Sequence, residues 1–261
     1  MKLMRSLIIF TFILLYNSGH LFGQDNTTLQ YFEGAIVRSN KNMKEIALVF
    51  TSDEYADGGQ YISGVLREKN IKGSFFFTGR FYRDPSNELL INTLVSDGHY
   101  LGAHSDQHLL YCDWDNNDSL LVDFVTFSSD LESNYEIMQL FGIARKEAKY
   151  FLPPYEWYNH QISNWCSQMG IQLVNYTPGT LSHTDYTTPE SSNYRSSREI
   201  FDSILDYEST NENGLNGFIL ILHIGSSPDR TDKFYYLLDN LIDELTNRNY
   251  SFCRIDRLLE L

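Results

Sequence analysis

The chain of 261 residues has only three cysteines and few basic residues. Cys112, Cys166 and Cys253 are too scattered for a disulfide framework, and none has the spacing of a metal site. Lysine and arginine number 20 against 34 acidic residues, so the formal net charge is −14 and no nucleic-acid partner is expected. The sequence also has no internal repeat and no glycine-rich phosphate loop. What remains is the composition of a globular protein, with 42% hydrophobic and 15% aromatic residues.

Long hydrophobic runs are missing as well. The apolar stretch Leu7–Tyr16 is too short to span a bilayer comfortably, but it follows Lys2 and Arg5 and precedes the polar residues NSGH and the small Gly23. This pattern predicts a signal peptide over residues 1–23, export to the periplasm or the cell exterior, and no membrane span after cleavage. An uncleaved anchor is the alternative. Residues 24–261 are predicted to form a single domain that is a monomer.

Seven apolar runs alternate with helical patterns along the chain. The expected strands are residues 46–50, 73–78, 99–103, 149–152, 171–176, 218–223 and 250–255, and the expected helices are residues 60–69, 87–96, 120–141, 161–169, 198–207 and 234–248. Strands separated by helices pair in parallel, so the predicted fold is α/β, either an open sheet or a closed barrel. Residues 177–197 form the longest segment without periodicity and are expected to line a site.

Ionisable side chains gather where several of these strands end. Asp53 and Glu54 follow the first strand, His104 and His108 follow the third, and His223 ends the sixth. In such folds the chemistry lies beyond the carboxyl ends of the strands. The two histidines are one helical turn apart, and two histidines with one carboxylate suffice for a catalytic metal with open positions. A second carboxylate and a third histidine would then supply a base and an acid.

The motifs at these strand ends resemble those of the NodB-homology polysaccharide deacetylases, carbohydrate esterase family 4. GHYLGAHSDQH is similar to the family's His-(Ser/Thr)-x-x-His metal motif, and IALVFTSDE followed by VLREKNIKGSFFFTGRF resembles the region of its Thr-Phe-Asp-Asp-Gly motif. YFLPPY resembles the Arg-Pro-Pro-Tyr motif and FILILH the Leu-x-Leu-x-His motif. The resemblance covers residues 44 to 255 and implies a distorted (β/α)7 barrel.

The resemblance also implies an activity and a set of roles. The protein would hydrolyse the acetyl group of an N-acetylated glycan, such as a chitooligosaccharide or another polysaccharide containing N-acetylglucosamine. One divalent ion, zinc in preference to nickel or cobalt, would be held by Glu54, His104 and His108. Water on the ion would attack the acetyl carbonyl, with Asp53 as base and His223 as acid.

Four further residues are expected to contact the substrate. The backbone N–H of Tyr155 would hold the developing oxyanion, and Trp157 would stack on a sugar ring. Leu220 and Leu222 would enclose the acetyl methyl group.

Three positions depart from the family pattern. Glu54 stands where the family has an aspartate, and Asp57 offers a competing register. Leu152 stands where the family has an arginine that keeps the base ionised, and Arg80 is the candidate to replace that charge. The motif that places an aspartate before a tryptophan is hard to locate, which leaves Asp185 as the candidate partner of the acid. A carbohydrate-binding relative without turnover and an O-acetyl esterase for xylan-like chains therefore stay open as alternatives.

Overall fold

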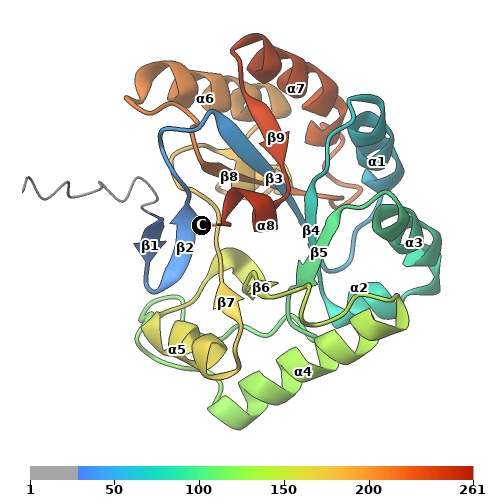
Figure 1. The fold of residues 1–261 in the computed structure, drawn as a ribbon, viewed down its shortest axis with the longest axis vertical. Coiled ribbons are helices and arrows are strands. Elements are labelled where there is room, and N and C mark those ends of the chain that lie inside the picture. The colour runs from blue at the N-terminus through green and yellow to red at the C-terminus, as the bar shows by residue number, and fades with distance from the viewer. Residues whose placement is uncertain (1–28, 261) are drawn as a thin grey trace, which may run out of the picture.

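The computed structural model describes residues 29–260 (Figure 1). Its strands are β1 (Gln30–Phe32), β2 (Ala35–Arg38), β3 (Glu45–Ser52), β4 (Ser74–Phe77), β5 (Tyr100–Ala103), β6 (Tyr150–Phe151), β7 (Gln172–Leu173), β8 (Phe218–His223) and β9 (Ser251–Cys253). Its α-helices are α1 (Gly59–Glu68), α2 (Gly79–Arg83), α3 (Glu88–Ser96), α4 (Phe124–Leu140), α5 (His160–Gln168), α6 (Ser197–Thr210), α7 (Leu238–Asn247) and α8 (Ile255–Leu258). Short 3-10 helices are η1 (Pro85–Asn87), η2 (Pro154–Glu156), η3 (Ser182–Thr184) and η4 (Phe234–Leu237). The proposed signal segment lies outside these residues.

The strands form one curled sheet in the order β1-β2-β8-β3-β4-β5-β6-β7. From β8 to β7 the neighbours are parallel, and β2 lies antiparallel beside β8. A parallel bridge between Ile36 of β2 and Val174, the residue after β7, closes the sheet into an irregular barrel. The predicted distorted barrel is confirmed.

One barrel strand differs from the prediction. The strand expected at residues 250–255 is present only as β9, Ser251–Cys253, because α8 begins at Ile255. β9 pairs with the start of β3, at Glu45–Ala47, and lies off the barrel order. The seventh place is taken by β2, which the β1–β2 hairpin brings alongside β8. Because β2 has only four residues and all are buried, no alternating pattern marks it in the sequence.

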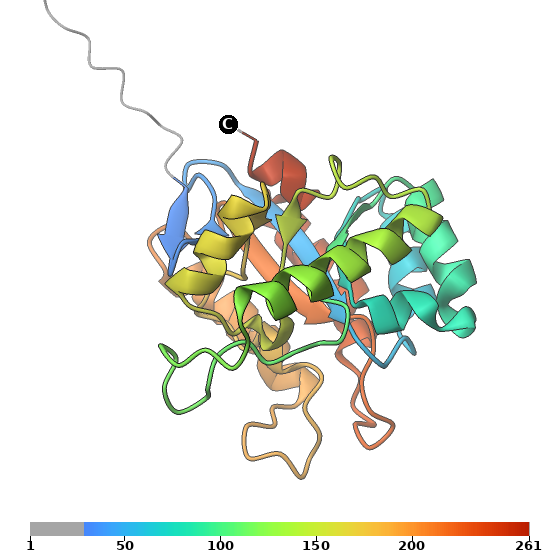
Figure 2. The same ribbon diagram turned by 90° about the horizontal axis from the view of Figure 1, so that it is seen from below.

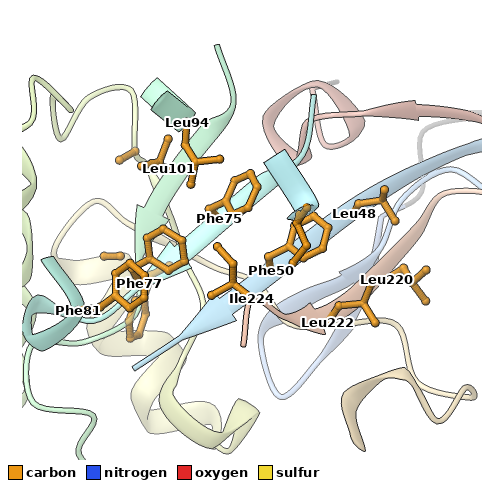
Figure 3. Packing of buried hydrophobic residues seen from close by; sticks show 14 of the residues in the cluster. Leu48, Phe50, Phe75, Phe77, Phe81, Leu94, Leu101, Leu220, Leu222 and Ile224 are labelled. Atoms are coloured by element: carbon orange, nitrogen blue, oxygen red, sulfur yellow. The ribbon is translucent and has the colours of Figure 1, made fainter. Parts of the chain in front are cut away.

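Alternating side chains on each strand divide the core into two layers. On β3, Leu48 and Phe50 belong to an outer cluster, shown in Figure 3, that includes buried residues of α1, α3 and α7. Ala47 and Val49 belong to an inner cluster that includes Ile255 of α8. This follows from the two-residue period of a strand, which sends successive side chains to opposite faces. The parallel strands are therefore apolar on both faces.

The long connections after β5, β7 and β8 extend from one end of the barrel, and the C-terminus lies at the other end (Figure 2). All six expected helices are present, although α4 begins four residues late because Asp123 caps it by accepting a hydrogen bond from the Thr126 N–H. Among residues 29–260, none of the helices is long and apolar enough to cross a membrane.

Candidate active site

Six of the residues predicted for the site line one small pocket. The cavity has a volume of about 230 Å³. The six are Asp53, Glu54, His104, His108, Tyr155 and His223. They follow or end β3, β5, β6 and β8, so the structure brings these strand ends together.

His104 and His108 lie on the loop that follows β5, with their ring centroids 5.2 Å apart. Their spacing suggested one helical turn, which is wrong: the segment is not helical, and His108 has a φ of 54°. Nδ1 of the buried His104 donates a hydrogen bond to the Leu152 carbonyl oxygen (2.7 Å), which leaves the Nε2 lone pair free. The two rings meet because the loop is held from outside, not because of helical geometry.

Two buried residues one turn apart on α4 hold this loop. Asp130 accepts hydrogen bonds from the Ser105 hydroxyl (2.5 Å) and the Asp106 N–H (3.0 Å), and Asn134 accepts one from the His104 N–H (2.8 Å). The sequence analysis missed both. Polar residues four positions apart on an otherwise apolar helix face are the available signal, because buried polar groups need partners.

Asp53 is held by two side chains that follow β4, from the N-cap and the first turn of α2. The Thr78 hydroxyl donates to Oδ1 at 2.8 Å, Arg80 Nε donates to the same oxygen at 3.0 Å, and a second guanidinium nitrogen bonds Oδ2. His108 Nδ1 lies 4.0 Å from Oδ2. Leu152 is buried in the inner core, so Arg80 is the cation beside this carboxylate.

We expect Arg80→Met to lower kcat for acetate release about 10- to 100-fold, because a carboxylate that loses its bidentate partner no longer keeps its position. Metal content should stay at the wild-type level. Arg80→Lys keeps the charge but loses the bidentate donors, so its kcat should lie between those of the wild type and Arg80→Met. Steady-state kinetics with metal analysis check this, and an unchanged kcat in Arg80→Met would exclude Arg80 from the site.

His223 at the end of β8 pairs with Asp185. The distance from Nδ1 to Oδ1 is 2.7 Å, and the His223 N–H donates to Oδ2 at 2.9 Å. Burial alone would lower the pKa of His223, but the charge and hydrogen bond of Asp185 outweigh it, and the pKa is raised above 6.5. Asp185 lies in the segment 177–197, which the sequence analysis expected to line a site. His223 therefore keeps its proton to higher pH than a free histidine.

Asp185→Asn should move the basic limb of the rate profile to lower pH. An acid acts only while protonated, so activity is lost as pH rises through its pKa, and without Asp185 the burial of His223 lowers that pKa. The measurement is kcat/KM for acetate release between pH 5 and 10. A basic limb that stays in place would mean that another group titrates there.

Tyr155 and Glu156 adopt left-handed backbone conformations, with φ of 59° and 53°. This region is unfavourable for residues with side chains, and such strain clusters at functional sites. The N–H groups of Glu156 and Trp157 donate to the carbonyls of Pro153 and Pro154, while the Tyr155 N–H makes no hydrogen bond to any residue in the range 29–260. That N–H is available to a substrate oxygen.

Glu156 is a pocket residue that the sequence analysis missed, although it directly follows the PPY motif. Burial raises its pKa to about 7; the nearby His223 opposes this shift and Asp185 adds to it. Tyr186, whose ring centroid lies 4.4 Å from that of His223, was also missed.

Asp57, the competing register, is engaged elsewhere. Its carboxylate accepts hydrogen bonds from the Tyr235 hydroxyl (2.9 Å) and the Ser226 N–H (2.8 Å) and forms an ion pair with Lys233 (3.0 Å). Asp57 does not line the pocket, whereas Asp53 and Glu54 do. The arrangement favours the Asp53/Glu54 register.

Three of the expected substrate contacts lie elsewhere. Leu220 and Leu222 are buried in the outer core (Figure 3), on the face of β8 opposite to His223, because alternate residues of a strand share a face. The expectation that they enclose the acetyl methyl is therefore wrong. Trp157 lies beside the catalytic pocket rather than in it, with its Nε1 donating to the Asp113 carbonyl at 3.2 Å.

Residues 38–174, just over half of the chain, match the polysaccharide deacetylase family. The chain belongs to this family. Peptidoglycan-N-acetylmuramic acid deacetylase PdaA of Bacillus subtilis is 24% identical over 226 residues, which cover 84% of this chain and 73% of that protein. Peptidoglycan-N-acetylglucosamine deacetylase of Bacillus cereus is 24% identical over 221 residues, which cover 84% of this chain and 89% of that protein.

Solved structures of family members share the fold. The structure of Bacillus subtilis PdaA, a family 4 carbohydrate esterase, has a TM-score of 0.66 at 22% identity and covers 87% of this chain and 85% of its own. A CE4 family pseudoenzyme from Bacillus anthracis has a TM-score of 0.64 at 15% identity, with 88% and 70% covered. The predicted resemblance and the hydrolase class are confirmed.

Deacetylases of this family are generally metal-dependent, and the histidine pair fits a metal ion. Burial lowers the pKa of His104 well below 6.5 and that of His108 to about 4, so both imidazoles are neutral, as ligands must be. Glu54 lines the same pocket with an exposed side chain. Across residues 29–260, no three His, Cys, Asp or Glu side chains gather closely enough to hold an ion. The two histidines that the sequence predicts as ligands lie together, whereas Glu54, the predicted third, is exposed.

Proposed function

We propose that this protein removes the acetyl group from an N-acetylated glycan outside the cytoplasm. The observation that carries the proposal is that Asp53 and His223 line the same pocket. Each has its own charged partner: Arg80 bonds to Asp53, and Asp185 bonds to His223. Hydrolysis of an amide needs a base for the water and an acid for the departing nitrogen. The two relatives named as peptidoglycan deacetylases support a cell-wall glycan as the substrate class and export as the location.

The reaction follows from the groups that line the pocket. Asp53, held by Thr78 and Arg80, takes a proton from the attacking water. The Tyr155 N–H donates to the oxygen that becomes negative as the carbonyl carbon turns tetrahedral. His223, kept protonated by Asp185, gives its proton to the leaving nitrogen as the C–N bond breaks. Acetate and a free amine remain.

His104, His108 and Glu54 are proposed to hold one divalent ion, zinc in preference to nickel or cobalt. When bound, the ion supplies Lewis-acid polarisation of the carbonyl and lowers the pKa of water. The chain itself contributes neutral histidines, of which His104 is fixed by the Leu152 carbonyl. Glu54, exposed at the rim, is free to complete the set.

The proposal is tested by acetate release from a panel of acetylated glycans, with the metal content of the purified protein determined in parallel. We expect release from N-acetylglucosamine oligomers or peptidoglycan and about one ion per chain, since the proposed ligands His104, His108 and Glu54 would hold a single ion. Release from acetylated xylan alone would replace this function with the O-acetyl esterase.

A glycan-binding protein without turnover is the second candidate. It is favoured by Glu54 lying exposed, which leaves no three-residue metal group in the described chain, and by the likeness to a family pseudoenzyme. Sugar binding without acetate release from any glycan in the panel would establish it.

A further inference from the structure

A fully buried arginine, Arg230, contacts the loop that carries Asp185. It lies between β8 and η4, and none of the ion pairs within residues 29–260 includes it. A guanidinium taken out of water is costly unless other groups satisfy its donors, and a carboxylate is the usual partner. Backbone carbonyls and one hydroxyl take that place here, so the segments to which they belong indicate what Arg230 does.

The acceptors of Arg230 lie at the two ends of one excursion of the chain. Nη1 donates to the Thr187 carbonyl at 2.7 Å, and Nη2 donates to the Arg195 carbonyl at 3.0 Å and to the Ser197 hydroxyl at 3.3 Å. Thr187 and Ser197 are buried, whereas residues 188–196 between them are exposed or half-buried. The excursion belongs to the long connection after β7 that extends from one end of the barrel (Figure 2). Arg230 therefore holds both of its ends at one buried point.

The Thr187 end of the excursion is a tight turn around Asp185. The Thr187 N–H and hydroxyl both donate to the Thr184 carbonyl, at 3.0 and 2.7 Å, which closes a turn with Asp185 at its second position. Both carboxylate oxygens of Asp185 accept hydrogen bonds from His223. The carbonyl that Arg230 binds lies two positions after this carboxylate, so a shift of Thr187 would move Asp185.

The other end of the excursion is held by Asp232. Its carboxylate accepts a hydrogen bond from the Ser197 N–H at 2.5 Å, and its carbonyl accepts one from the Ser197 hydroxyl at 3.0 Å. Ser197 is the first residue of α6, so the start of this helix and the turn at Asp185 are fastened to the same three-residue segment, 230–232. The segment after β8 thus holds the loop after β7 in place.

The charge of Arg230 does not explain a supporting role for the acid. Burial lowers the pKa of His223, Asp185 and Glu156 raise it, and Arg230 lowers it. A positive charge near a protonated imidazole favours loss of the proton, so Arg230 opposes protonation of His223 by its charge. Any support that it gives must come through the position of Asp185.

We propose that Arg230 is a positioning residue for His223: by binding both ends of the excursion, it keeps Asp185 within hydrogen-bond distance of the imidazole. This inference rests on the proposed function, in which His223 is the acid. Arg230 is not among the residues that line the catalytic pocket, so it acts on the reaction through Asp185 and not by contact with the substrate.

Arg230→Lys tests this role, because it keeps the charge but loses the planar arrangement of donors that reaches three acceptors. NMR of the imidazole nitrogens in substrate-free protein between pH 5 and 10 should show a lower pKa of His223 than in wild type. The kcat for N-acetylglucosamine pentamer should fall about tenfold with KM unchanged, since the acid is displaced while the substrate contacts remain. An unchanged pKa of His223 would overturn the proposal.

Arg38→Lys is the matched control. Arg38 is also buried, and it donates to the carbonyls of Gly214 and Asn216, which precede β8 and do not line the pocket. This variant should lose stability as Arg230→Lys does, but the pKa of His223 should stay at the wild-type value. An equal fall of that pKa in Arg38→Lys would show a general effect of instability and overturn the proposal.

A double variant shows whether the effect passes through Asp185. In the Asp185→Asn background, Arg230→Lys should cause no further fall in the pKa of His223, because the contact that Arg230 maintains is already lost. A further fall as large as that in the wild-type background would contradict the positioning role.

Ser197→Ala gives a milder test should Arg230→Lys fail to fold. It removes one acceptor of Arg230 and leaves the arginine in place, so the pKa of His223 should fall by a smaller amount. No change in that pKa would count against the proposal. Because the NMR measurement needs no turnover, a lowered pKa in a protein that releases no acetate would refute the proposed activity and leave the positioning of Asp185 standing.

Discussion

His104→Ala should lose the metal ion and with it all measurable acetate release. The loss of affinity should exceed about 100-fold, since removing only an outer partner of a ligand costs roughly 10- to 100-fold. His104 is 2% exposed and its ring is fixed by the Leu152 carbonyl, so no neighbouring group can take its place without moving the loop. Metal content after dialysis and a titration with Zn²⁺ measure the effect.

Two further variants make this result interpretable. His108→Ala should behave in the same way while disturbing the core less, because its side chain is 16% exposed rather than buried. His160→Ala, at a histidine 72% exposed, should keep full metal content. Full occupancy with unchanged affinity in both His104→Ala and His108→Ala would show that the histidine pair is not a metal site.

Asp53→Asn should reduce acetate release about 10²- to 10⁴-fold, the range that a general base contributes. The amide keeps the shape and the hydrogen bond from Thr78, but it cannot take a proton from water. Metal should remain bound. Acetate release measured at saturating substrate, with the metal content of the same sample, checks the loss of activity and the retention of metal.

Asp57→Asn is the control for the register of the first motif. Its carboxylate is occupied by Tyr235 and Lys233, away from the pocket, so activity and metal content should stay near wild type. Loss of metal in Asp57→Asn together with an active Asp53→Asn would transfer the site to the competing register.

Most of the fold was predictable from local patterns in the sequence. Alternating apolar runs and helices placed six of the seven barrel strands and all six expected helices. The prediction was wrong at the seventh strand: β9 has the stronger strand pattern, but β2, which pairs with β8, completes the barrel. A four-residue strand such as β2 forms because of the neighbours it packs against, so the β-propensity of its residues is weak evidence for it.

The order of motifs along the chain was sufficient to place Asp53, Glu54, His104, His108 and His223 at one end of the barrel. The reason is geometric: in parallel strands every carboxyl end lies on the same edge, so residues that follow different strands must converge. Successive side chains of a strand point to opposite faces, so in FILILH Leu220 and Leu222 lie on the face away from His223. This placement could have been predicted from the sequence alone.

Only the tertiary structure decided which partners these residues have. Asp185 reaches His223 across 38 positions of chain, Arg80 reaches Asp53 across 27, and Asp130 of α4 holds the loop that carries His104 and His108. No periodicity encodes such pairs, because each depends on how an irregular loop folds back and on which buried charges need neutralising. Glu156 enters the pocket for the same reason: a left-handed turn, set by its surroundings and not by its own preference, places it among the residues that line the pocket with His223.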